Sequence, residues 1–324
     1  MPKVELNNGM EIPMIGIAMW HKLVYLDRMC HSLHLVEPQE KIQEREGLEN
    51  ALEAGFRHFD LGQVFNNQKM LGKIFKKYWD SGRIRRSDMF LTSKVWNTCH
   101  SFDACIGAVD KTLEDLQTDY IDLMLIHYPQ GWAEDGKFIN QKDSLIDYVE
   151  TWKALEHCVG QGKVKGIGLC NFNLKQVQRI LECAKLMPVV VQAELSVVYK
   201  KHLPLMRACM EKSIAFEAQW PFGKESTEPT TTISVDASKE VKAMAQYLGM
   251  KPRQLALIWL LQKGVIALPR AISYSECTSY LEALDHRLSD EDMLELDTKV
   301  PDSFPSWNDG IVDTNHRLWP WRSN

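Results

Sequence analysis

Polar side chains stand where successive short apolar segments of the sequence end. Asp60, Lys94 and His127 bring a carboxylate, an ammonium group and an imidazole to three such ends. If the segments are parallel strands, these groups meet at one rim and could form an acid–base site. Any one of them could instead be a polar plug between strand and loop, but several at successive ends favour a site. Further polar residues on or just after such segments are Asn171, Gln192, Gln219 and Arg270.

Eight apolar segments must position these side chains. They are rich in Val, Ile, Leu and Phe, most are too short for helices, and amphipathic stretches separate them, which is typical of buried parallel strands. The pattern favours an α/β fold, a (β/α)8 TIM barrel, over an open doubly wound sheet, because no G-x-G-x-x-G follows the first segment. The expected strands lie within Ile15–Met19, Phe56–Asp60, Met89–Val95, Tyr120–His127, Val164–Asn171, Val189–Leu195, Ile214–Gln219 and Val265–Pro269.

Other segments complete a single domain over residues 1–324, with no interdomain linker. Asn7-Asn8-Gly9 predicts the turn of a short hairpin between Lys3–Leu6 and Glu11–Pro13. Thr227–Ser234 is expected to be a surface loop and Asp302–Asn324 an irregular tail. Helices are expected over Ser238–Tyr247, Arg253–Lys263 and Ser289–Val300, the last with Ser289 as its N-cap.

Composition limits the classes of partner. The 324 residues are 45% hydrophobic and 25% charged, as in an ordinary globular protein, and the net charge of −5 favours no nucleic-acid partner. The 8 cysteines include no C-x-x-C pair, which indicates a reduced protein, and we predict no metal site. The N-terminus is too polar for a signal peptide, and no apolar run reaches the ~18 residues of a membrane span. We therefore expect a cytoplasmic protein without a membrane partner.

Four stretches of the sequence resemble the aldo-keto reductase family, and the likeness runs from about Val4 to Leu296. This resemblance implies a (β/α)8 barrel and NADPH-dependent reduction of small aldehydes and ketones. The stretches are AGFRHFDLGQVFNNQKMLG, LTSKVWNTCH, LEDLQTDYIDLMLIHYP and GKVKGIGLCNFN.

The resemblance places Asp60, Lys94 and His127 in the family's catalytic set. At the fourth position, where the family has a proton-donating tyrosine, this chain has Phe65, and the next tyrosine downstream is Tyr78. Hydride addition builds negative charge on the carbonyl oxygen, and loss of a positioned general acid costs ~10²–10⁴ in rate. We expect Asp60 and Lys94 to remain as a buried ion pair, while His127 could still donate to an oxygen.

The cofactor positions implied by the resemblance are altered as well. Cys170, Asn171 and Gln192 stand where the family holds the nicotinamide carboxamide, although the family usually has Ser before the Asn. Gln219 replaces the tyrosine that stacks on the nicotinamide ring. The side chain of Trp220 is expected to point to the other side of its strand, unless a shifted register returns it.

The segment after the eighth strand also departs from the family. Arg270, Ala271 and Glu276 stand where the family surrounds the 2′-phosphate of NADP(H). Arg270 can bind a phosphate by paired hydrogen bonds, whereas Glu276 would repel it. A carboxylate could accept from ribose hydroxyls, which makes NAD(H) less disfavoured than in the usual relative. Glu276 could equally be an ordinary first-turn helix residue.

Three aromatic residues are candidate walls of a substrate pocket: Trp20, Trp96 and Tyr128. Each could also be an ordinary core or rim residue. The link from Trp20 to Asp60 contains the stretch YLDRMCHSLHLVEPQEK and is longer than usual for the family. It could cover the pocket, bind a protein partner or form a solvent loop.

Two functions follow from these residues. The first is an aldo-keto-reductase-like barrel with impaired or lost NADPH-dependent carbonyl reduction, which could retain nucleotide or protein-partner binding. It is favoured by the joint changes at Phe65, Gln219 and Glu276. The alternative is an active NAD(P)H-dependent aldehyde or ketone oxidoreductase that uses His127 as proton donor.

Overall fold

Eight parallel strands form one sheet in the part of the chain that the structure, a computed structural model, describes: residues 1–20, 38–133, 144–223 and 234–302. The sheet closes on itself, because Gly16 N donates to Ala267 O at 2.9 Å and Ala267 N donates to Met14 O at 3.0 Å. The predicted (β/α)8 barrel is confirmed, and each predicted segment contains one strand. The strands are β3 (Ile17–Ala18), β4 (His58–Asp60), β5 (Phe90–Val95), β6 (Ile121–Ile126), β7 (Val164–Cys170), β8 (Val190–Glu194), β9 (Ala215–Gln219) and β10 (Ile266–Leu268).

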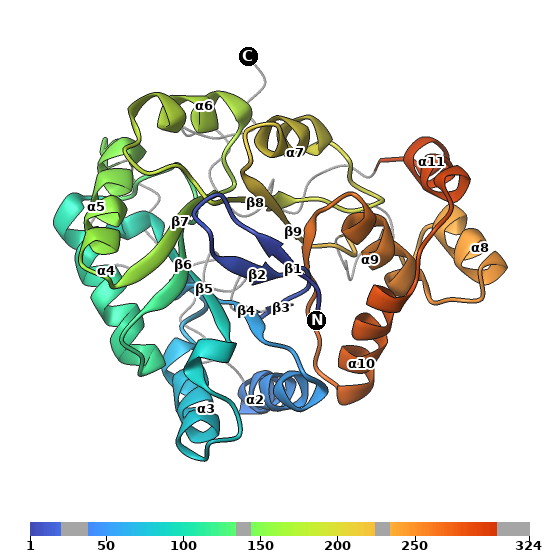
Figure 1. Cartoon of the computed structure of the whole chain (residues 1–324), viewed down its shortest axis with the longest axis horizontal. Coiled ribbons are helices and arrows are strands. Elements are labelled where there is room, and N and C mark those ends of the chain that lie inside the picture. Colours follow the sequence, from blue (N-terminus) through green and yellow to red (C-terminus); the bar gives the residue numbers. More distant parts are fainter. Residues whose placement is uncertain (21–37, 134–143, 224–233, 303–324) are drawn as a thin grey trace.

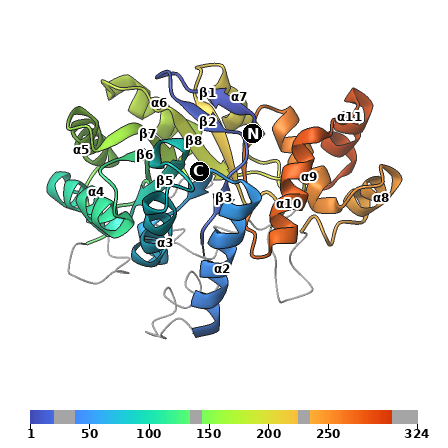
Figure 2. The same ribbon diagram turned by 60° about the horizontal axis from the view of Figure 1, so that its bottom comes forward.

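Helices surround the barrel (Figures 1 and 2). Their apolar side chains pack on the outside of the sheet. The helices predicted near residues 238, 253 and 289 are α8, α9 and α11. Ser289 accepts from Asp292 N, so the predicted N-cap is confirmed. The helices are α2 (Pro38–Ala54), α3 (Gln68–Asp80), α4 (Phe102–Leu116), α5 (Tyr148–Gly160), α6 (Leu174–Cys183), α7 (Leu203–Met210), α8 (Lys239–Tyr247), α9 (Pro252–Gln262), α10 (Tyr274–Glu282) and α11 (Asp290–Lys299).

The predicted hairpin covers the amino end of the barrel. Strands β1 (Lys3–Glu5) and β2 (Glu11–Pro13) pair antiparallel and lie across the barrel in Figure 1. In the turn, the Asn7 amide donates to Pro188 O at 2.9 Å, just before β8 begins. Leu6 and Ile12 join the apolar residues inside the barrel. Because the hairpin closes this end, the carboxyl end is left for chemistry.

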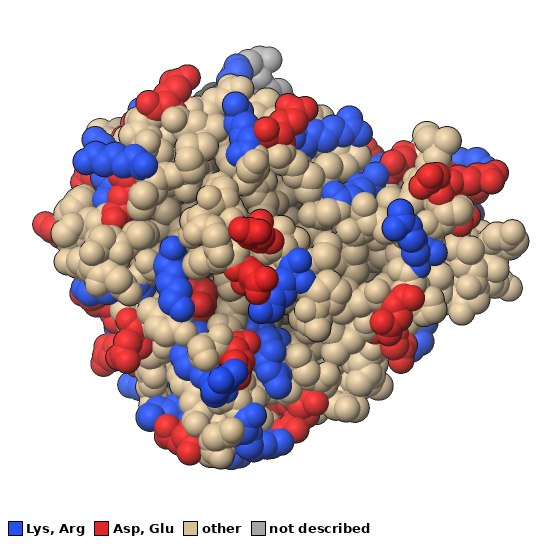
Figure 3. Space-filling model, in the orientation of Figure 1, with Lys and Arg blue, Asp and Glu red and all other residues tan. Residues whose placement is uncertain are grey.

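Charges of both signs are interspersed on the face that carries the hairpin (Figure 3). Lys3 Nζ lies 3.0 Å from Glu11 Oε2, and Lys165 Nζ lies 3.7 Å from Asp122 Oδ1. Among the described helices, none is long and apolar enough to span a membrane.

Three predictions fall on residues outside the described ranges. They concern most of the Thr227–Ser234 loop, the tail after Asp302 and most of the long link that follows Trp20.

The crossing of α3 and α4 depends on Gly72. An added Cβ there would lie 2.1 Å from Asp115 O and 2.7 Å from Leu116 Cα, both backbone atoms that cannot turn aside. We expect Gly72→Ala to lower the free energy of unfolding by about 1–3 kcal/mol or more, measured by urea titration. Gly107→Ala in α4 is the matched control, because its Cβ meets nothing within 4 Å, and it should gain roughly 0.5–1 kcal/mol. Equal stability of the two variants would contradict this account of the crossing.

Candidate active site

Asp60, Lys94 and His127 meet at the carboxyl end of the barrel, as predicted. They line one small hollow, which has a volume of about 20 Å³. That volume holds about one water molecule. The remaining described residues around it are Ala18, Trp20, Phe65, Gln219 and Trp220.

Asp60 and Lys94 form the expected buried ion pair. Asp60 lies opposite Thr92 in the register of β4 and β5, so Lys94, two residues further along, faces the same interior. Lys94 Nζ donates to Asp60 Oδ1 at 2.5 Å and to Leu61 O at 2.8 Å. The two charges therefore neutralise each other within the barrel.

Removing one partner of this pair should be costly. We expect Lys94→Met to lower the free energy of unfolding by about 3–5 kcal/mol, because it leaves the Asp60 carboxylate buried without its cation. The double variant Asp60→Asn, Lys94→Met should lose clearly less than the sum of the single losses. Urea titration of the three variants measures this, and strictly additive losses would refute the pairing.

His127 is a neutral imidazole at ordinary pH. Burial, followed by the nearby Lys94 charge, holds its pKa well below the usual value. Its Nδ1 is buried and has no hydrogen-bond partner among the residues that the structure describes. The ring stacks on Tyr128 at 5.1 Å between centroids and meets Trp96 edge-on at 5.2 Å. Trp96 and Tyr128 are buried, and of the three predicted pocket walls Trp20 is the one among the described residues that line the hollow.

Phe65 occupies the position opposite His127. It ends a short 3₁₀ turn, Gln63–Phe65, that follows β4, and its ring centroid lies 6.2 Å from that of the imidazole. The turn is anchored, because the Asn67 amide donates to Met19 O at 2.8 Å. No tyrosine is among the described residues that line the hollow.

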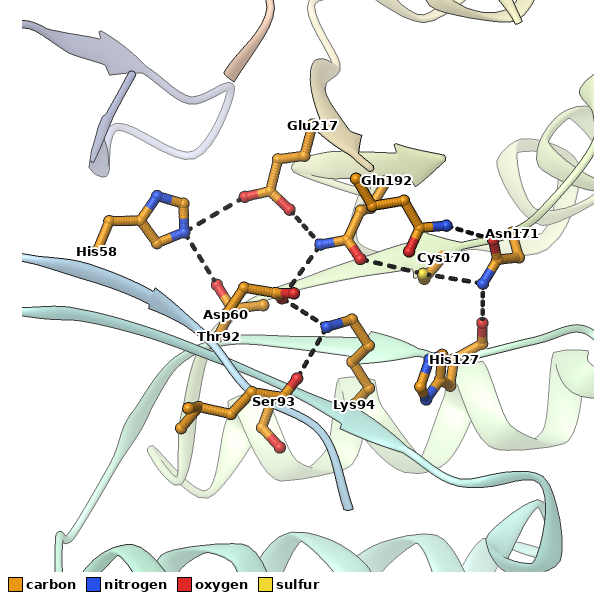
Figure 4. A network of polar contacts seen from close by, with 12 residues as sticks. His58, Asp60, Thr92, Ser93, Lys94, His127, Cys170, Asn171, Gln192 and Glu217 are labelled. Carbon is orange, nitrogen blue, oxygen red and sulfur yellow. Dashed lines mark hydrogen bonds and ion pairs between the residues drawn. The ribbon is translucent and has the colours of Figure 1, made fainter. Parts of the chain in front are cut away.

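The three residues predicted to hold a carboxamide are bonded to one another. The Cys170 thiol donates to Gln192 Oε1 at 3.2 Å and accepts from Asn171 Nδ2 at 3.2 Å. Asn171 Nδ2 also donates to His127 O at 3.0 Å. Burial raises the pKa of the Cys170 thiol, so it stays protonated and unreactive. Figure 4 shows these contacts beside the Lys94 ammonium.

The end of β9 differs from what the sequence predicts. Gln219 Nε2 donates to Asn171 Oδ1 at 2.6 Å. Trp220 was expected on the other side of the strand, but it lines the same hollow as Gln219. The expectation is wrong because Trp220 has a left-handed φ of 55°, which breaks the strand alternation. Its ring packs on Trp20 at 3.9 Å between centroids.

Sequence reasoning missed two buried titratable residues beneath the site, Glu217 and His58. Gln192 Nε2 donates to Glu217 Oε2 at 2.8 Å and to Asp60 Oδ1 at 3.2 Å (Figure 4). Glu217 Oε1 lies 3.6 Å from His58 Nε2. A glutamate within an otherwise apolar strand, two residues before Gln219, was the signal that could have revealed this layer.

These two residues are neutral near pH 7. Burial, reinforced by the Asp60 carboxylate, raises the pKa of Glu217 to about 8, and burial lowers the pKa of His58 to about 3. His58 Nδ1 faces Pro13 O at 3.3 Å, so Nδ1 carries the ring proton and Nε2 is an acceptor. Thr92 Oγ1 lies 3.5 Å from that acceptor, and Glu217 Oε1 lies 3.6 Å from it, just beyond hydrogen-bond distance.

Comparison with known proteins identifies the family. The Aldo/keto reductase family matches residues 33–301. This chain belongs to the aldo-keto reductase family. Aldo-keto reductase family 1 member A1 of Mus musculus is 32% identical over 304 residues, covering 91% of this chain and 88% of the relative. The Homo sapiens protein of the same name is 31% identical, with 90% and 87% covered.

Solved aldo-keto reductases share the whole fold. The aldose reductase of Schistosoma japonicum has a TM-score of 0.84 at 28% identity and covers 100% of both chains. An aldo-keto reductase of Bombyx mori, solved in complex with NADP, has a TM-score of 0.84 at 25% identity and covers 98% of both.

In this aldo-keto reductase, Glu276 caps the N-terminus of α10. Its Oε2 accepts from the backbone N–H groups of Ile272 and Ser273 at 3.0 and 3.1 Å, and Ser273 Oγ accepts from Glu276 N. This is a capping box, the local role that the sequence left open. Arg270 lies over the ring of Trp20 at 5.6 Å, beside the central hollow.

A larger pocket of about 370 Å³ lies between α9 and α10. Its two cations, Lys251 and Arg253, are matched by two carboxylates, and Arg253 lies 2.7 Å from Asp236 Oδ2 and 3.9 Å from Glu276 Oε1. Such a pocket offers a phosphate dianion little net attraction. The residues around it are Asp236, Lys251, Pro252, Arg253, Ser275, Glu276, Ser279 and Tyr280.

The residues present do not fit the nicotinamide end of NADP(H). The amides of Asn171 and Gln192 bond within the chain, and Trp20 and Trp220 pack against each other over a hollow with room for about one water.

Proposed function

We propose that this aldo-keto reductase has lost, or retains only in strongly impaired form, the reduction of small carbonyl compounds. The observation that carries the proposal is Phe65, whose ring faces Asp60, Lys94 and His127 across the hollow and brings no hydroxyl to it. A carbonyl oxygen that receives a hydride needs a proton, and neither the Lys94 ammonium, held by Asp60, nor a phenyl ring supplies one.

NADP(H) is the cofactor that family membership supports, with NAD(H) as the other dinucleotide of this chemistry. The lack of fit at the nicotinamide end argues for weak binding of either one. Asp236 and Glu276 beside the larger pocket argue against a strong preference for the 2′-phosphate. Retained binding of a nucleotide or a protein partner remains part of the proposal, as does a cytoplasmic location.

The proposal is tested by assaying the purified chain with NADPH and with NADH on a reactive aromatic aldehyde. We expect cofactor oxidation at 340 nm no faster than in the enzyme-free blank, whereas an active aldo-keto reductase under the same conditions gives a clear rate. Turnover of about 1 s⁻¹, ordinary for an enzyme, would refute the proposal.

One observation favours reduction with His127 as donor. Its imidazole lines the hollow, and in the neutral form one ring nitrogen carries a proton that it can donate to a carbonyl oxygen. In this case turnover would persist and would be lost in His127→Phe, a change that keeps the ring and removes the donor.

A further inference from the structure

Two inward-facing residues of β9, Glu217 and Gln219, bond to the side chains that would hold a nicotinamide carboxamide. We propose that Gln219 is an internal substitute for that carboxamide, so that the nicotinamide end of a dinucleotide adds nothing to binding. The inference deepens the proposed function and rests on it. It assigns Gln219 the role of a positioning residue that keeps the nicotinamide site closed.

The chemistry of the two groups is the same. A glutamine side chain ends in a primary amide, and so does nicotinamide. Gln219 Nε2 donates to Asn171 Oδ1 at 2.6 Å, and the amide nitrogen of nicotinamide is a donor of the same kind that would need such an acceptor. Because Gln219 belongs to the same chain, its amide is present at a high effective concentration, and a free ligand must displace it.

The side-chain amide of Gln192, the second that would hold the carboxamide, is hydrogen-bonded to buried side chains inside the barrel. Gln192 Nε2 donates to Asp60 and to Glu217, and Gln192 Oε1 accepts from the Cys170 thiol. Gln192 and Glu217 are fully buried, so water cannot replace these contacts. A cofactor amide would therefore have to break bonds inside the barrel to reach Gln192.

Gln219 differs from this buried layer because it is partly exposed, as are Trp20 and Trp220. Because these three side chains are partly exposed, we expect them to move aside more readily than the buried layer. Of the three, Gln219 is the one that bonds to the acceptor Asn171 Oδ1. A substitution of Gln219 therefore tests the inference.

The test compares two ligands that differ only in nicotinamide: NADP⁺ and 2′-phospho-ADP-ribose. Their dissociation constants are measured by isothermal titration calorimetry on the full chain. We expect the wild type to bind both with constants that agree within about threefold. Gln219→Met keeps the side-chain length and removes the amide, and it should tighten NADP⁺ binding about three- to tenfold, the equivalent of one ordinary hydrogen bond. Binding of 2′-phospho-ADP-ribose should not change.

Gln246→Met, at an exposed position on α8, is the matched control and should leave both constants unchanged. Gln219→Ala repeats the test if the methionine variant is poorly folded by its melting curve. Wild-type binding of NADP⁺ more than tenfold tighter than of the fragment would overturn the inference. So would variants that gain no NADP⁺ affinity, including variants that bind neither ligand. Turnover by the wild type would refute the proposed function instead, so the two failures can be told apart.

Discussion

Phe65→Tyr alone is expected to raise NADPH-dependent aldehyde reduction by less than about tenfold, whereas Phe65→Tyr with Gln219→Tyr should raise it by ~10²–10⁴. The single change returns a phenol beside Lys94 and His127, in a hollow that has room for a hydroxyl. Gln219 still donates to Asn171 Oδ1, however, so Asn171 cannot position the nicotinamide, which is the hydride donor. The second change removes that amide and supplies an aromatic face.

Initial rates of NADPH oxidation with a reactive aldehyde measure both effects. Gln219→Tyr alone is the control, and it should bind NADPH better without a comparable gain in rate, because Phe65 still lacks a proton. A Phe65→Tyr single variant as fast as the double variant would show that Gln219 does not obstruct the site.

Glu217→Gln should stabilise the protein at pH 8 by several kcal/mol, up to ~5, and by little at pH 5. The native pKa of Glu217 is raised to about 8 from the ordinary value of 4.5. Between pH 4.5 and about pH 8 the unfolded chain has released a proton from Glu217 that the native state keeps. The free energy of unfolding therefore falls as pH rises through this range. Glutamine resembles the protonated carboxyl, because it is neutral and its oxygen can accept from Gln192.

The difference in the free energy of unfolding between Glu217→Gln and the wild type, taken at each pH, separates the effect of the Glu217 carboxyl from that of other titrating groups. His58 acts in the opposite sense, since its lowered pKa of about 3 makes stability rise with pH up to about 6.5. Lys94 and Asp60 face the same layer as an ion pair, and we expect them to remain paired in the variant. Urea titrations from pH 5 to pH 9 give the difference, with Glu5→Gln at an exposed position as control. A gain that does not change with pH would mean that Glu217 is ionised in the native state.

The sequence predicted the barrel because its signals are local. Short apolar runs rich in β-branched residues, the Asn-Gly turn and the Ser289 cap each act within a few residues, and the structure has a strand, hairpin or helix at each of them. The meeting of Asp60, Lys94 and His127 also followed, since parallel strands deliver their ends to one rim.

The contacts among the side chains at and beneath the site could not be predicted from local sequence signals. The bond from Gln219 to Asn171 joins residues 48 apart, and its formation depends on rotamers rather than on spacing. The position of Trp220 depends on one left-handed φ angle after β9. Glu217 was overlooked because a carboxyl in a strand is read as exposed, whereas here the closed barrel buries it.

The most direct measurement uses NADPH labelled with deuterium at the transferable position of its nicotinamide ring. The wild-type chain is incubated for hours with this cofactor and a reactive aldehyde, and the alcohol is analysed by mass spectrometry. If Phe65 leaves the site without a proton source, the deuterated alcohol stays at the level of the enzyme-free blank. Deuterated alcohol that accumulates in proportion to the amount of wild-type chain would contradict the account.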